Sequence, residues 1–163
     1  MKFIPFEHLI YITDLSEQEI FTRLSERVET KKFRIIRTHS IKQYKGHVRN
    51  DNTFEISRIL KYRNSFQPEI EGKFQQSNNT VRIEVKMGLN LFVILFTIFW
   101  CSMAFLFFIV QISSNAEWSF ETFLPLFMLF FGYLMVLVGF KVESGRSKKD
   151  LSKIFEAEGM IDQ

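Results

Sequence analysis

The strongest pattern in the chain is a pair of long apolar runs in its second half. The first run (89–112) carries no charge, and the second (120–140) carries only Glu121, near its start. A helix needs about 20 apolar residues to cross a bilayer core about 30 Å thick, and both runs reach that length. The pattern therefore predicts a transmembrane helical hairpin over 88–140, with its two spans at these runs and the polar link 113–119 between them.

Before the spans, the pattern first has a helical period and then a period of two. A short strand is predicted at 8–13. Ser16 and Glu19 then have the form of a capping box, which marks a helix start. The helix should end near Lys32. Its apolar stripe consists of Ile20, Phe21, Leu24 and Val28. From there the alternation predicts strands at 33–37, 40–48, 54–62, 68–75 and 80–87.

The order of these elements predicts an α+β domain over 1–87, in which a strand, a helix and an antiparallel meander follow one another. The strand at 40–48 alternates poorly, and a bulge at Gly46 would explain the irregularity. Only Gly88 separates the last strand from the first span. The sheet should therefore lie close to the membrane surface.

The last part of the chain (141–163) is predicted to be a tail with a short amphipathic helix. Ser144 and Gly145 suggest a turn, and residues from Ser147 to Asp150 would cap the helix that follows. The apolar stripe of this helix is Leu151, Ile154 and Phe155. The stripe either docks on the sheet domain or lies in the lipid interface. Docking is favoured because five basic and five acidic residues balance the charge of the tail.

Basic residues predict the orientation of the hairpin. Lys86 precedes the first span and Lys141 follows the second, while the link between the spans has no Lys or Arg. The positive-inside rule then places both termini in the cytoplasm. No cleavable signal peptide is expected, because the first apolar stretch breaks off too early. We expect an integral membrane protein, and the composition suits a bacterial inner membrane.

Candidate catalytic patterns are weak. Cys101 is the only cysteine and lies within a predicted span, and the histidines have no metal-binding spacing. No serine-protease order of residues and no phosphate loop is present. Glu69 and Glu71 share a strand face, and ion pairing with Lys73 or Arg82 is a better reading than catalysis. We therefore expect no enzyme activity, no cofactor and no metal.

The segment before the spans is basic. Residues 1–87 hold sixteen Lys and Arg against eleven Asp and Glu, a net charge of +5. Six of these basic residues come close together in the sequence: Lys42, Lys45, Arg49, Arg58, Lys61 and Arg63. They would suit anionic lipid headgroups or a partner surface, and the alternative is a solvated sheet face. Binding to nucleic acid is not expected, because no recognition helix or aromatic RNA-binding strand is present.

The segment 62–68 (YRNSFQP) contains Asn64 and Ser65 in a predicted turn. The turn is either capped by its own side chains or contacts a headgroup or a partner. The segment resembles a stretch of the form RNSF-x-P, followed by a later glycine, that precedes the spans of small uncharacterised bacterial two-span membrane proteins. The resemblance covers only part of the chain and implies no activity.

Small residues in the spans suggest close packing of helices. Ser102, Gly132 and Gly139 would let the hairpin pack on itself or dock on partner helices. The hypothesis favoured by the sequence is a non-enzymatic accessory or regulatory subunit of a larger membrane complex. The alternatives are a membrane-anchored module that binds anionic lipid and an immunity-type or inhibitor protein that guards a membrane target. The sequence does not predict the oligomeric state.

Overall fold

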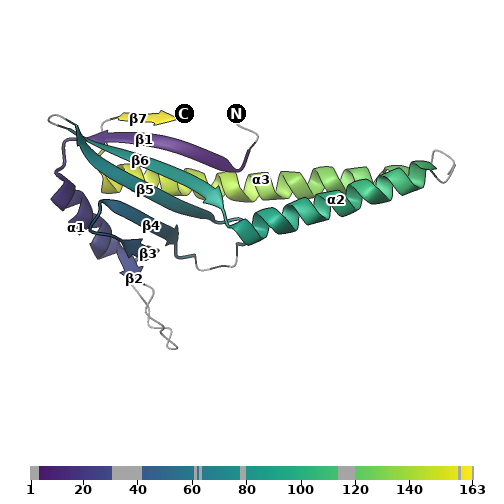
Figure 1. The fold of residues 1–163 in the computed structure, drawn as a ribbon, viewed down its shortest axis with the longest axis horizontal. Helices are drawn as coiled ribbons and strands as arrows, with labels where there is room; N and C mark the ends of the chain where they lie inside the picture. The colour runs from purple at the N-terminus through teal and green to yellow at the C-terminus, as the bar shows by residue number, and fades with distance from the viewer. Residues whose placement is uncertain are drawn as a thin grey trace.

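The computed structural model describes residues 4–30, 42–60, 62, 64–77, 80–113, 120–157 and 159–162. Within these residues, seven strands form one mixed sheet, and two long apolar helices project side by side from one end of it (Figure 1). The helices are α1 (Glu17–Arg27), α2 (Leu91–Ser113) and α3 (Phe120–Ile154). The strands are β1 (Phe6–Thr13), β2 (Val28–Thr30), β3 (Tyr44–Val48), β4 (Thr53–Arg58), β5 (Pro68–Ser77), β6 (Thr80–Leu89) and β7 (Gly159–Asp162).

The strand order in the sheet is β2-β3-β4-β5-β6-β1-β7. The predicted meander is confirmed from β3 to β6, where every neighbouring pair is antiparallel. The two edge strands were not predicted: β2 pairs with β3 in parallel, and β7 pairs with β1 in antiparallel orientation. The strand predicted at 33–37 lies outside the described residues. The chain therefore has an α+β domain built on a mixed sheet and a pair of long apolar helices.

The bulge predicted at Gly46 is wrong. The register of β3 on β4 is continuous, with Gly46 opposite Ile56 and both neighbours in step. Gly46 instead has a φ of +151°. A Cβ atom there would lie 2.0 Å from the carbonyl oxygen of Glu55. A close approach of two backbones, rather than an extra residue, therefore explains the glycine.

Helix α1 starts as predicted and ends earlier. The Glu19 carboxylate accepts a hydrogen bond from the Ser16 backbone N–H at 2.9 Å, and the Ser16 hydroxyl accepts one from the Glu19 N–H at 3.3 Å. This confirms the capping box. Val28, the expected last member of the apolar stripe, has extended geometry and begins β2 opposite Tyr44. A β-branched residue packs well in a strand, and pairing with β3 satisfies its backbone.

The tail is not a separate short helix. Helix α3 is continuous over 35 residues and includes both the second apolar run and the tail segment to Ile154. The predicted turn at Ser144 and Gly145 and the predicted cap at Ser147 are therefore wrong. Both serines are fully buried, and the Ser144 hydroxyl donates to the carbonyl of Lys141 within the helix at 3.3 Å. Burial against the sheet outweighs a low helix propensity of roughly 1 kcal/mol at the glycine.

The apolar stripe of the tail docks on the sheet, as predicted. Leu151, Ile154 and Phe155 are buried in the main core cluster, together with residues of α1 and the sheet. The Phe155 ring packs edge-on against Tyr11, with ring centroids 5.5 Å apart. The Thr13 hydroxyl donates to the Phe155 carbonyl at 2.6 Å. The core of the sheet domain is therefore built partly from residues that follow the second apolar run.

The two projecting helices are long and apolar enough to cross a membrane by length and composition. Most of their large side chains face outward, and Ala104 is the only residue of α2 that is buried. A single residue, Asn90, separates β6 from α2, and its side chain accepts a hydrogen bond from the Phe92 N–H at 2.9 Å. This contact satisfies one of the free N–H groups at the helix start.

Candidate functional site

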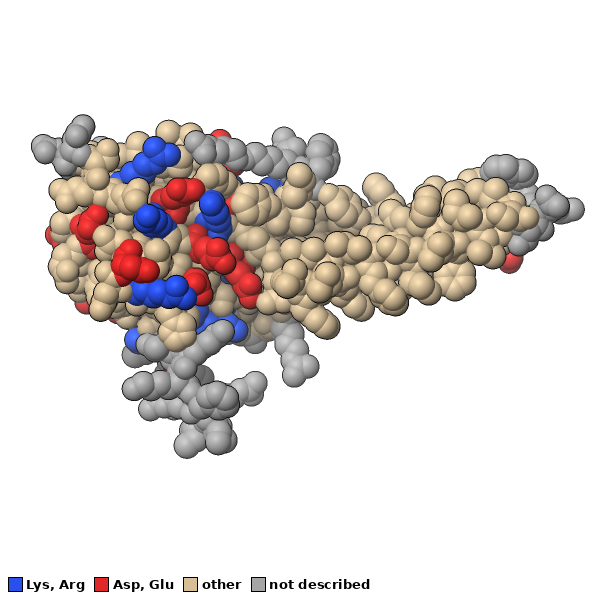
Figure 2. Space-filling model, in the orientation of Figure 1, with Lys and Arg blue, Asp and Glu red and all other residues tan. Residues whose placement is uncertain are grey.

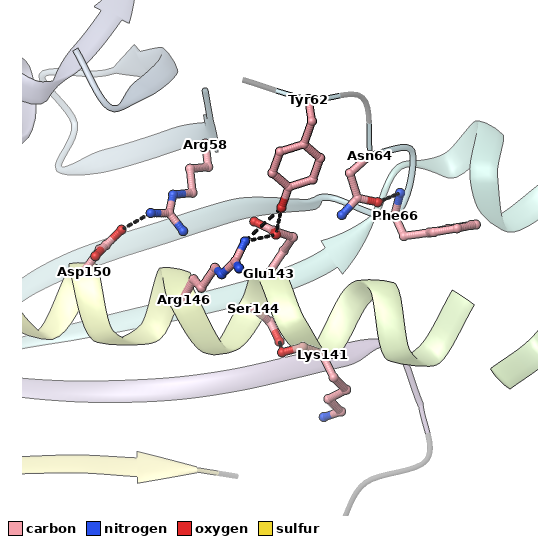
Figure 3. A network of polar contacts seen from close by, with 9 residues as sticks. All are labelled: Arg58, Tyr62, Asn64, Phe66, Lys141, Glu143, Ser144, Arg146 and Asp150. Atoms are coloured by element: carbon pink, nitrogen blue, oxygen red, sulfur yellow. Dashed lines mark hydrogen bonds and ion pairs between the residues drawn. The ribbon is translucent and has the colours of Figure 1, made fainter. Parts of the chain in front are cut away.

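Polar contacts gather where α3 passes from its apolar half onto the sheet (Figure 3). The Glu143 side chain is 1% exposed there, and its Oε1 atom accepts a hydrogen bond from the Tyr62 hydroxyl. Arg146 Nη1 lies 2.9 Å from both the Glu143 carboxylate and the Tyr62 oxygen. The hydrogen bond from the Tyr62 hydroxyl to Glu143 raises the pKa of the Tyr62 phenol above its ordinary value. The phenol therefore stays a proton donor at neutral pH.

A second buried carboxylate lies on another side of α3. Glu7, on β1, has a side chain that is 4% exposed and faces two ammonium groups. Lys141 Nζ lies 2.8 Å from its Oε1 atom, and Lys148 Nζ lies 2.9 Å from its Oε2 atom. A carboxylate taken out of water needs such partners, because its desolvation costs several kcal/mol. Glu7 therefore joins α3 to strand β1, whereas Glu143 joins α3 to Tyr62.

The segment that joins β4 to β5 runs along α3 at this point. We call it the strap (residues 59–67, of which 61 and 63 are not described). At its β4 end, Arg58 pairs with Asp150 of α3 at 3.0 Å. Further along, Tyr62 contacts Glu143. The strap therefore follows α3 in the direction of the apolar half.

The far end of the strap rests on a glycine. Phe66 lies over Gly139, where a Cβ atom would come 2.8 Å from the ring carbon Cδ2. The Asn64 side chain accepts a hydrogen bond from the Phe66 N–H at 3.0 Å and so holds the turn. This contact supports the prediction that the turn is capped by its own side chains. Ser65 is exposed in the same turn.

The predicted basic cluster does not form one patch among the described residues. Arg58 pairs with Asp150, Arg49 pairs with Glu55 at 2.8 Å, and Lys42 donates to a backbone carbonyl of β2 at 2.8 Å. Lys45 is exposed on the outer sheet face, and Lys61 and Arg63 lie outside the described residues. Figure 2 shows acidic and basic side chains next to one another over the sheet. The face is mixed in charge rather than basic.

The acidic residues considered for catalysis serve other contacts. Glu69 accepts a hydrogen bond from the Asn90 side chain at 2.8 Å, next to the start of α2. Glu71 stands opposite Lys86 on β6 in the strand register. Neither position faces Lys73 or Arg82 directly, so the partners expected from the sequence are wrong.

Two of the three small residues predicted to pack, Gly132 and Gly139, lie at contacts within the chain. A Cβ atom on Gly132 would meet the Trp100 indole of α2 at 3.3 Å, and Gly139 contacts the strap. Ser102 is exposed on α2, where Ala104 is the buried small residue instead. The contacts fit packing of the hairpin on itself. Docking of the same residues on partner helices stays a prediction.

An apolar groove runs between α2 and α3 below the strap. Its volume is about 350 Å³, and it is lined by residues that include Phe66, Phe96, Trp100, Met128, Met135 and Val136. A second hollow of about 290 Å³ shares Trp100 and Met128 with it and continues to Pro125. The two form one seam along the hairpin.

No family model, curated protein or solved structure matches this chain. The function must therefore be argued from geometry. Among the described residues, no group of three or more His, Cys, Asp or Glu side chains could hold a metal ion. The arrangement consists of charge pairs that position a helix, together with an apolar seam.

The sequence pointed to none of Glu7, Tyr62 and Glu143 as site residues. A signal was present for two of them. Glu7 falls on the inward face of β1 with Leu9, and Glu143 is the one acid among several basic residues just after the second apolar run. An acid at either place needs a basic partner when the chain folds.

Proposed function

We propose that α2 and the first half of α3 cross a membrane as a hairpin, with the sheet domain in the cytoplasm, as in the inner membrane of a bacterium. The outward side chains support this, since Leu91 is 68% exposed and Phe92 is 75% exposed. A continuous apolar surface of this kind is unfavourable in water. Strand β1 pairs with β7, so these two strands lie on the same side of the hairpin. This agrees with the orientation predicted from the basic residues.

We further propose that the protein is a non-enzymatic accessory subunit of a larger membrane complex. The observation that carries this proposal is the continuity of α3. One helix of 35 residues supplies both an apolar half and part of the core of the sheet domain. Its length is about 52 Å, of which about 30 Å would lie in the bilayer. The hairpin and the sheet then move as one unit, which suits a protein that positions a partner.

The outer face of the sheet supports this role. It carries side chains of both signs, including Glu55, Glu71, Lys73 and Lys86. Figure 2 shows acidic and basic side chains together over the sheet, whereas α1 and the end of α3 pack into the core on the other face. Mixed charge at a partner interface contributes specificity and association rate more than affinity. The partner expected on this face is therefore a polar protein surface with complementary charges at the membrane.

A lipid-binding cup is less well supported as the main function. The inner face of the sheet is filled by Leu151, Phe155 and the buried residues of α1. Because these tail residues belong to the core, a fragment that ends at residue 87 lacks part of its own interior. Binding experiments therefore need the full chain.

The test is a pull-down of the full chain from native membranes in a mild detergent. The proposal predicts a partner at a near one-to-one ratio. Glu71→Lys on the outer face should weaken this capture in a salt-dependent way, because surface charges are screened by salt. Glu26→Lys, at an exposed position of α1, makes the same change of charge away from this face and should leave the capture unchanged. A protein that purifies alone, with phospholipid only, contradicts the subunit proposal.

A further inference from the structure

The groove between α2 and α3 opens toward the strap side of the hairpin, and its occupant can be argued from its lining and its rim. The argument rests on the membrane insertion proposed above. The lining is almost entirely apolar, and it includes Phe66 at one end with Trp100 and Met128 further along. From Val136 to Met128 the groove follows α3 for about 12 Å, and the second hollow extends it to Pro125. A narrow apolar seam of this length fits a hydrocarbon chain.

The rim of the groove carries a cation. Arg146 follows Gly139 by seven residues, which places it about 10 Å further along the helix. The second apolar run ends at residue 140, next to Gly139, so this position marks the edge of the hydrocarbon core. Headgroups occupy several ångströms beyond that edge, and Arg146 therefore reaches their depth. Its side chain is 54% exposed, and both of its hydrogen bonds use Nη1. Among the described residues, none accepts a hydrogen bond from its Nη2 or Nε atom.

The wider charge of this helix segment favours an anionic ligand. Residues 141–149 of α3 carry four Lys and Arg and one Glu. Lys141 and Lys148 are used by Glu7, whereas Arg146 and Lys149 are exposed. A basic residue close to a membrane surface attracts anionic lipid by about 1 kcal/mol. The rim therefore complements a phosphate at the depth where lipid phosphates lie.

We propose that the hairpin binds one anionic phospholipid from the leaflet on the sheet-domain side. One acyl chain lies in the groove against Phe66 and Trp100, and the phosphate binds the free guanidinium nitrogens of Arg146. Glu143 and Tyr62 hold that guanidinium in place through Nη1. Both parts of the site border the strap, because Phe66 lines the groove and Tyr62 contacts Arg146. A partner helix in the same groove would have to carry an acidic residue at the depth of Arg146.

The first test uses the full chain in mixed vesicles of phosphatidylglycerol and phosphatidylcholine, followed by mild extraction and native mass spectrometry. One phosphatidylglycerol per chain is expected to stay bound. Met135→Trp fills the groove and should remove this lipid. Leu134→Trp is the matched control, because Leu134 is exposed on the same helix and does not line the groove. Arg146→Gln should lower the preference for phosphatidylglycerol about fivefold, whereas Lys153→Gln should not.

The second test leaves the groove unaltered. The chain has two tryptophans, so Trp118→Phe makes Trp100 the only one. Phosphatidylglycerol with brominated acyl chains should quench the Trp100 fluorescence and saturate at one lipid per chain. Brominated phosphatidylcholine should need a higher fraction for the same quenching.

Several results would overturn the site. Lipid retention that is equal in the two tryptophan variants, or quenching that rises with lipid fraction without saturation, would mean ordinary annular lipid only. If the Met135→Trp variant loses a co-purifying protein while its bound lipid is unchanged, the groove binds a protein instead of a lipid. A chain that is inserted and bound to its partner but holds no lipid would contradict this inference alone. A chain that is absent from the membrane fraction would contradict the proposed function as well.

Discussion

The two halves of α3 use apolar residues in opposite ways. In the first half Phe127 and Phe130 are each 63% exposed, and they face away from the chain. At the other end Leu151, and Phe155 directly after the helix, are fully buried against the sheet. One continuous helix can do both only if its surroundings differ along its length. Under the proposed membrane insertion, the exposed phenylalanines of the first half contact lipid, and the buried apolar residues at the other end belong to the core of a domain in water.

Polar residues show the same contrast in reverse. Beyond the apolar half, α3 brings buried Glu143, Ser144 and Ser147 against the sheet, and Glu7 reaches it from β1. Buried ion pairs add little net stability, because desolvation offsets their attraction. We interpret them as contacts that select one rotation and one height of α3 on the sheet. The predictions below test this division of the helix, from the largest expected effect to the smallest.

Phe155→Ala should destabilise the protein by about 3–5 kcal/mol, because it leaves a cavity beside Tyr11 and Phe54. Phe130→Ala, in the exposed half, is the control and should change the free energy of unfolding by much less. The measurement is denaturant unfolding of the full chain in detergent. Equal losses in the two variants would mean that the halves do not differ as described.

Glu7→Gln should cost about 1–3 kcal/mol, because Lys141 and Lys148 lose their shared carboxylate. Their ammonium groups are only partly exposed and keep part of their desolvation penalty. Glu29→Gln, on the edge strand β2, is a matched control. The same unfolding assay measures both. An unchanged stability in Glu7→Gln would show that this carboxylate does not hold α3.

Two of the three glycines of α3, Gly139 and Gly145, should respond to an alanine substitution with opposite signs. Gly139→Ala puts a methyl group 2.8 Å from the Phe66 ring and should destabilise by about 1–2 kcal/mol as the strap shifts. Gly145→Ala meets nothing within 4 Å and should stabilise by up to about 1 kcal/mol through helix propensity. A stabilising Gly139→Ala would contradict the strap contact.

The smallest effect is expected on the outer sheet face. His8 lies 2.7 Å from Glu84, and this hydrogen bond lowers the pKa of the Glu84 carboxyl. A lowered pKa contributes stability above the ordinary Glu value of about 4.3, which is lost as pH falls through the folded-state value. Wild type should therefore lose slightly more stability than His8→Ala between pH 6 and pH 3. Parallel pH profiles would rule out this contribution.

The capping box at Ser16, the strands from β4 to β6 and the two apolar runs could be predicted because each is a local pattern. Strand β7 could not, since its four residues are all exposed and pair with β1 only after α3 has crossed the sheet. The false turn at Gly145 had the same cause. A glycine beside serines reads as a turn until the sheet that buries Ser144 and Ser147 is known.

The candidate site was less predictable than the fold. Tyr62 and Glu143 are 81 positions apart in the sequence, and no local pattern links them. Among the described members of the basic cluster, Lys45 and Arg58 lie on neighbouring strands but on opposite faces of the sheet, because successive residues of a strand point to opposite faces. Arg58 is the one described member of that cluster that contacts α3, because β4 ends where the strap meets this helix.

The most direct test of the central claim is a distance measurement along α3 in lipid bilayers. Spin labels are placed at Phe130 and Lys149, both exposed, in a Cys101→Ser background. A continuous helix predicts one narrow distance distribution near 28 Å between the labelled positions, from 19 residues at 1.5 Å each. A broad or clearly shorter distribution would show a hinge near Gly145, and the hairpin and sheet domain would then not form one unit.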